Sequence, residues 1–216
     1  MSRSTTVERI LDSAELLFAE HGFAETSLRA ITSDAKVNLA AVNYHFGSKK
    51  ELIQAVFGRF LDPFMAGLDQ SLENLSSDSK MMEVEEVLEL LVNHILAVKP
   101  RRPNDIAIFM RLMGLAYTQN QGHLKRFLTE SYGATLARYF EKLYGSCPGL
   151  PVSDMYWRSY FILGSAIFAM SGSEALLAIA KRDHGIDDDI EAIMRRMVPF
   201  MAAGLRAHAT YDEGHS

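Results

Sequence analysis

A short stretch near the N-terminus carries side chains suited to the surface of double-stranded DNA. Asn43 offers both a donor and an acceptor, which match N6 and N7 of adenine in the major groove. Asn38 and Ala40 stand near it in the sequence and are our other candidates for base edges, because an alanine can contact the methyl group of thymine. Lys36 and Lys49 flank the stretch and can bind phosphate. These residue types predict a surface that reads nucleic acid.

Two short helices joined by a tight turn must position these side chains. Apolar spacing predicts a first helix over residues 6–21, ended by Gly22, a second helix over 27–36 and a third over 40–46. Val42 should face the protein interior. In a helix-turn-helix the second helix of the pair lies in the major groove, and the first crosses the phosphate backbone. The helix over 40–46 is therefore the one expected to enter the groove.

The rest of the 216-residue chain also has the periodicity of helices. Apolar residues recur at spacings of three and four, and no strand-length alternation of apolar and polar residues is present. The sequence therefore predicts an all-α fold. Prolines, glycines and polar runs separate the further helices, which we expect at residues 49–74, 82–99, 104–120, 122–145, 153–181 and 188–208.

The distribution of charge indicates a basic tip on an acidic body. The whole chain has a formal net charge of −5, yet residues 26–50 contain only one acidic residue, Asp34. The basic residues of this stretch are Arg29, Lys36, Lys49 and Lys50. A basic tip binds phosphate locally, while an acidic body repels the duplex and orients the approach.

Other features exclude several classes of protein. A single cysteine, Cys147, excludes an intramolecular disulfide and fits a reducing cytoplasm. Residues 1–8 lack the apolar core of an export signal, and the most apolar run, 160–170, is shorter than the roughly 20 residues of a membrane span. The sequence has no metal-spaced His/Cys cluster, glycine-rich phosphate loop or nucleophile elbow. We expect a cytoplasmic protein that is not an enzyme and has no membrane segment, metal or cofactor.

The residues around the predicted turn form part of a longer pattern. Residues 22–31 are followed at fixed spacing by Val37, by Asn-Tyr-His-Phe at 43–46 and by Ser-Lys-Lys-Glu-Leu at 48–52. This pattern, nearly continuous over residues 6–55, resembles the signature of the TetR family of transcriptional regulators. The resemblance implies a homodimer that binds an operator in double-stranded DNA, with its two reading helices in successive major grooves.

The resemblance also assigns roles to single residues. Thr26 and Ser27 open the second helix, where hydroxyls and backbone N–H groups hold a phosphate. The hydroxyl of Tyr44 meets a phosphate beside His45, for which a DNA contact and packing under the helix are both open. Lys49 begins the fourth helix, so that its ammonium and the N-terminus of that helix act on one phosphate.

Two positions near the turn leave alternatives. Lys36 stands where the family usually has a glycine. Either the turn is altered, or Lys36 adopts the left-handed αL conformation at a modest cost and adds a phosphate contact. Arg29 either reaches phosphate or forms a surface ion pair.

The resemblance implies two functional domains. Residues 1–47 would form the three-helix DNA-binding domain, and residues 48–216 the larger helical domain for ligand binding and dimerisation, with the helix over 48–74 connecting the two. Similar proteins dimerise through their last two long helices, which here correspond to residues 153–181 and 188–208.

The ligand pocket of the family lies among the middle helices. The helix over 104–120 is apolar on most sides, so we expect it to be central and its cation Arg111 to be buried. Arg111 then needs either a carboxylate partner, such as Glu89 or Glu130, or the acidic group of a ligand. The candidate pocket residues are Arg111, Met110, Met113, Tyr117, Asn93 and His94.

A finer resemblance points to an effector. Residues 6–12, 37–50 and 52–57 resemble the PsrA-type, fatty-acid-responsive subgroup of the family. That resemblance implies a long-chain fatty acid or acyl-CoA as the small-molecule effector of a repressor, and lipid-degradation genes as its targets. The alternatives are a TetR-type regulator that responds to an unrelated ligand, or one that acts as an activator.

Overall fold

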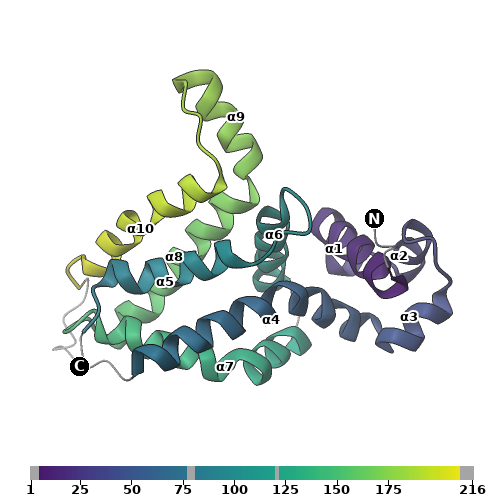
Figure 1. Ribbon diagram of the computed structural model, residues 1–216, viewed down its shortest axis with the longest axis horizontal. Helices are drawn as coiled ribbons and strands as arrows, with labels where there is room; N and C mark the ends of the chain where they lie inside the picture. The colour runs from purple at the N-terminus through teal and green to yellow at the C-terminus, as the bar shows by residue number, and fades with distance from the viewer. Residues whose placement is uncertain (1–4, 77–80, 120–121, 210–216) are drawn as a thin grey trace. The chain divides into compact units, whose positions relative to one another are not determined.

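Helices make up the whole of the regular structure that is described. The computed structural model describes residues 5–76, 81–119 and 122–209, and within these ranges every regular element is an α-helix (Figure 1), which confirms the all-α prediction. The helices are α1 (Thr6–Glu25), α2 (Leu28–Asp34), α3 (Leu39–Phe46), α4 (Lys49–Ser76), α5 (Val84–Ala97), α6 (Asp105–Thr118), α7 (Gly122–Gly145), α8 (Val152–Ser171), α9 (Ser173–His184) and α10 (Ile190–Arg206).

The prediction of one long helix over 153–181 is wrong, because the chain forms two helices there. α8 and α9 meet at Gly172 with an angle of 71° between them (Figure 1). Gly172 has φ −102° and ψ 11°, and its N–H donates to the carbonyl of Phe168. Glycine is a poor helix former, so the break falls at this residue. None of the described helices alone has both the length and the apolarity of a membrane span, and the bent α8–α9 pair meets that test by length and composition only.

Packing divides the chain into two compact units. The first comprises Met1–Pro63 and Pro100–Ser131, and the second comprises Phe64–Lys99 and Tyr132–Ser216. The first unit is larger than the domain expected over residues 1–47. It includes the first half of α4 and all of α6, because α6 packs along α1 and aromatic rings of α4 and α6 contact each other.

Gly22 turns the chain inside the first unit. It leaves helical geometry, as predicted, with φ 83° and ψ 167°, and α1 continues past it as a kinked last turn. Phe23 is thereby buried, with ring centroids 5.5 Å from Phe18 and 6.1 Å from Phe57. A Cβ at position 22 would lie 2.7 Å from Nε2 of Gln119, whose Oε1 accepts from the N–H of Phe23 at 3.3 Å. Both the positive φ and the close approach of Gln119 therefore favour glycine here.

A buried arginine fastens two helices of the second unit. α10 packs against α5 and α8, and Arg158 of α8 is buried at the C-terminal end of α10. Its Nη1 donates to the carbonyls of Gly204 at 3.1 Å, Leu205 at 3.0 Å and Ala207 at 2.6 Å, and its Nη2 donates to that of His208 at 2.8 Å. The last carbonyls of a helix have no partner within the helix, so the guanidinium supplies the missing donors.

Candidate DNA-binding surface

Side-chain caps define the two helices of the helix-turn-helix. Ser27 is the N-cap of α2, and its Oγ accepts from the N–H of Ala30 at 3.1 Å. Asn38 is the N-cap of α3, and its Oδ1 accepts from the N–H of Ala41 at 2.8 Å. Val42 is fully buried and anchors α3 to the unit. The caps fix where each helix starts, and the buried valine fixes which face of α3 points outward.

The turn between α2 and α3 settles the alternatives for Lys36. This residue has φ 54° and so adopts the αL conformation. Its N–H donates to the carbonyl of Ser33 at 3.2 Å, and the N–H of Val37 donates to that of Thr32 at 3.0 Å. These two bonds form a Schellman motif at the end of α2. Lysine therefore occupies the position that usually favours glycine, with its side chain exposed beside α3.

The outward face of α3 presents the side chains that the sequence nominated for DNA. Ala40 and Asn43 are exposed, and Tyr44 is 85% exposed. His45 is exposed as well, with its ring centroid 5.0 Å from that of Tyr44 in an edge-on arrangement, so the alternative of packing under the helix does not hold. Leu39, the first residue of α3, is also exposed. Leu39 is not among the candidates from the sequence, which places it just before the helix expected over 40–46.

The phosphate contact predicted for the hydroxyl of Thr26 is wrong. Thr26 is buried at the end of α1, and its Oγ1 donates to the carbonyls of Gly22 at 2.8 Å and Leu17 at 3.0 Å. A hydroxyl with these bonds cannot face a phosphate. Ser27, one residue later, is exposed at the N-terminus of α2.

Basic residues border the exposed face of α3. Nζ of Lys49 donates to the carbonyl of Ala24 at 3.3 Å. Partial burial lowers the pKa of its ammonium by more than the nearby Glu25 raises it, so the pKa lies below its usual value. Lys50 is exposed in the first turn of α4. Arg29 of α2 is exposed, and it forms no ion pair with any of the residues that the structure describes. The surface ion pair that we left open for Arg29 is therefore absent there.

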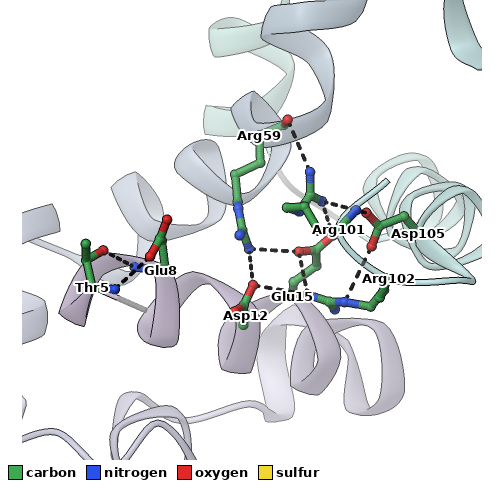
Figure 2. A network of polar contacts seen from close by, with 8 residues as sticks. All are labelled: Thr5, Glu8, Asp12, Glu15, Arg59, Arg101, Arg102 and Asp105. Carbon is green, nitrogen blue, oxygen red and sulfur yellow. Dashed lines mark hydrogen bonds and ion pairs between the residues drawn. The ribbon is translucent and has the colours of Figure 1, made fainter. Parts of the chain in front are cut away.

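In the same packing unit, a cluster of charged side chains links α1 to α4 and to the start of α6 (Figure 2). At its centre is Glu15 of α1, whose side chain is only 3% exposed. Its carboxylate lies 3.1 Å from Nη1 of Arg59 in α4, and 3.0 Å and 3.5 Å from Nη2 of Arg101 and Arg102, just before α6. A buried carboxylate needs cationic or hydrogen-bonding partners, and here three guanidiniums surround the single carboxylate of Glu15.

Two further carboxylates complete this charge cluster. Asp12, one turn before Glu15 on α1, lies 2.8 Å from Arg59 and 3.1 Å from Arg102. Asp105 at the start of α6 is buried, accepts from the backbone N–H of Arg101 and lies 3.4 Å from Nε of Arg102. The cluster fixes α1 against the first half of α4, the helix that begins beside α3.

The six candidate pocket residues fall in both packing units. Met110 is buried in α6, Met113 is half-buried, and Tyr117 is exposed. Arg111 is also exposed, so its predicted burial is wrong. The reason is that α6 buries its apolar stripe against α1 and α4 and leaves position 111 on the opposite side.

The other two candidates belong to the second unit. Asn93 is exposed on α5, and its Oδ1 accepts from Nη1 of Arg195 at 3.3 Å. His94 is half-buried with Nε2 2.9 Å from Oγ of Ser71, and burial lowers its pKa. Both polar side chains thus have protein partners.

Comparison with known protein families identifies the family of this chain. Residues 10–56 match the sequence profile of bacterial regulatory proteins of the tetR family, and residues 89–204 match that of the tetracyclin repressor-like C-terminal domain. The chain belongs to the TetR family. It is therefore a DNA-binding transcriptional regulator, as the pattern over residues 6–55 predicted.

Relatives and solved structures agree with the TetR assignment. The chain is 32% identical over 87 residues to the probable HTH-type transcriptional regulator YttP of Bacillus subtilis, a match that covers 40% of this chain and 41% of YttP. Among solved structures, it resembles the fatty acid degradation regulator FadR from Bacillus halodurans, with a TM-score of 0.59 and 18% identity over 96% of this chain and 100% of that one.

FadR from Bacillus subtilis, solved in complex with stearoyl-CoA, is also similar in fold. The TM-score is 0.57 with 16% identity, and the match covers 91% of this chain and 97% of that one. At these identities the likeness shows the TetR fold and leaves the effector of this regulator to be tested.

Proposed function

We propose that this TetR-family regulator binds a two-fold symmetric operator as a homodimer, represses the adjacent genes, and is released from DNA by a long-chain fatty acid or acyl-CoA. The observation that carries the DNA-binding part is the exposed face of α3. The Schellman turn and the caps of α2 and α3 hold Ala40, Asn43 and Tyr44 outward, with basic side chains on both sides. Such a regulator acts in the cytoplasm, where it meets the chromosome.

An exposed aromatic face on α8 supports the homodimer. Tyr156, Trp157, Phe161 and Phe168 are all exposed, and Phe168 is 72% exposed. The rings of Tyr156 and Trp157 contact each other, as do those of Trp157 and Phe161. Contiguous apolar surface of this kind marks a site of association, and a symmetric dimer buries it by packing one α8 against its copy. α10, which packs on α8, adds the exposed ring of Phe200.

Two observations support an acyl effector. The stretches at 6–12, 37–50 and 52–57 resemble the PsrA-type subgroup, and two proteins of similar fold are FadR regulators, one of them solved with stearoyl-CoA. Regulation then follows from linkage. A ligand that prefers a dimer state in which the spacing of the two α3 helices no longer matches the half-sites lowers the population of the DNA-binding state.

We expect oleoyl-CoA to weaken operator binding by at least about tenfold, which corresponds to about 1.4 kcal/mol of coupling. The measurement is fluorescence anisotropy of a labelled operator, selected from random duplexes, at one fixed salt concentration. Oleate separates a fatty acid from its thioester, and acetyl-CoA is the control for the nucleotide part alone. Operator affinity that stays unchanged at saturating oleoyl-CoA and oleate would overturn the effector and leave the DNA-binding function standing.

A further inference from the structure

The outward face of α3 lacks charged side chains other than a histidine. The helix, described throughout, runs Leu-Ala-Ala-Val-Asn-Tyr-His-Phe, without Asp, Glu, Lys or Arg. The basic residues of the region stand outside it, at Arg29 in α2, at Lys36 in the turn, and at Lys49 and Lys50 in α4. His45 lies in the last turn, and its ring contacts Tyr44. The first turn of α3, which meets base edges in a helix-turn-helix, is thus apolar or neutral.

Each base presents a different chemistry in the major groove. Guanine is read by the donors of Arg or Lys, and cytosine by the acceptors of Asp or Glu. Adenine is read by Asn or Gln through N6 and N7, and thymine by apolar contact with its methyl group. Before Tyr44 and His45 in its last turn, α3 presents only apolar residues and an asparagine, and such a reading surface complements A·T pairs.

Leu39 has the geometry of a reader of thymine. It is the first residue of α3 and is 40% exposed, whereas Val42, on the inner face of the helix, is fully buried. Its neighbour Ala40 is exposed and presents a second methyl group.

The two asparagines have different tasks. Oδ1 of Asn38 accepts from the N–H of Ala41 as the cap of α3, so this carboxamide cannot also make the paired donor–acceptor contact with adenine. Asn43 is exposed one turn after Leu39, and no hydrogen bond within the described chain engages its side chain. Asn43 is therefore the residue of α3 that can make this contact.

We propose that Leu39, together with Ala40, reads thymine methyl groups, that Asn43 reads adenine, and that the base pairs contacted by α3 in each half-site are A·T pairs. This inference rests on the proposed binding of a two-fold symmetric operator. It names the sequence class that the same surface selects and adds Leu39 as a residue that determines specificity.

The test removes single methyl groups from the DNA. Operators are first selected from random duplexes with the full-length protein, and the thymines of each half-site are then replaced one at a time by deoxyuridine, which lacks only the 5-methyl group. We expect about fourfold weaker binding for each contacted methyl, the effect of losing one buried methyl group, and a loss on the order of tenfold when both half-sites are changed.

The variant Leu39→Ala makes the test specific to one side chain. It should weaken binding to the thymine operator and lose most of the difference between the thymine and deoxyuridine operators. Leu16→Ala is the matched control, because Leu16 is 45% exposed on α1 and lies outside the reading helix. This control should retain the full deoxyuridine effect.

The outcomes separate the inference from the function on which it rests. If no duplex is enriched, the proposed operator binding is itself wrong. If a duplex is enriched but its contacted positions are G·C pairs, or deoxyuridine and thymine bind equally well, the inference on Leu39 is overturned while operator binding stands. If Leu39→Ala keeps the full deoxyuridine effect, a different side chain reads the methyl groups.

Discussion

Replacing the buried carboxylate at the centre of the charge cluster, in the variant Glu15→Leu, is expected to lower the free energy of unfolding by about 3 kcal/mol. Three guanidiniums lie within 3.5 Å of this carboxylate, and each is at most one quarter exposed. Without Glu15, the three partly buried guanidiniums lose the carboxylate that they share. The resulting loss of stability is larger than the stability that burial of the apolar leucine side chain contributes. Urea unfolding followed by circular dichroism measures the loss.

Asp12→Asn is the control for this prediction. Asp12 belongs to the same charge cluster and lies 2.8 Å from Arg59, but its side chain is 44% exposed. An ion pair open to water contributes little, so we expect a loss below about 1 kcal/mol. Equal losses for the two variants would mean that the burial of Glu15 does not determine the strength of the cluster.

A second large effect is expected in the other packing unit, from Arg158→Met. The guanidinium donates to four carbonyls at the end of α10, and a methionine of similar length donates to none. Buried carbonyls left without donors should lower the free energy of unfolding by about 3 kcal/mol. The same urea experiment measures it, and the loss of dimer at low protein concentration is a second readout, because α8 carries the proposed dimer face.

Two variants show whether the geometry of the guanidinium matters. Arg158→Lys keeps the charge but not the planar fork of donors, so it should restore only part of the lost stability. Asp154→Asn removes the carboxylate 3.5 Å from Nη2 of Arg158 and should have a small effect, because that bond is long. If Arg158→Lys is as stable as the unmodified protein, the role of Arg158 is one of charge alone.

Local chemistry made much of the DNA-binding surface predictable. Gly22 ends the regular part of α1, Ser27 caps α2, and Lys36 adopts one of the two conformations that the sequence allowed. Each of these features depends on residues a few positions away, which are visible in the sequence. The outward positions of Asn43 and Tyr44 were predictable in the same way, since the buried Val42 fixes the inner face of α3, which packs against α1 and α2.

Features that depend on distant residues could not be predicted. Glu15 and Arg101 are 86 positions apart, and nothing near either of them indicates that a charged side chain is buried. Arg158 likewise finds its acceptors 46 to 50 positions later, at the end of another helix. The place of Thr26 before α2 suggests a phosphate contact, but its hydroxyl donates instead to two carbonyls of α1, which the sequence does not reveal.

The central claim is that the exposed face of α3 reads a DNA sequence. The most direct measurement compares, at one fixed salt concentration, the dissociation constants of the full-length protein for a selected duplex and for a shuffled duplex of equal composition. We predict tighter binding of the selected duplex by a factor of about a thousand or more, with one dimer on a two-fold symmetric site. Equal affinities for the two duplexes would contradict the claim, because contacts to phosphate alone cannot tell them apart.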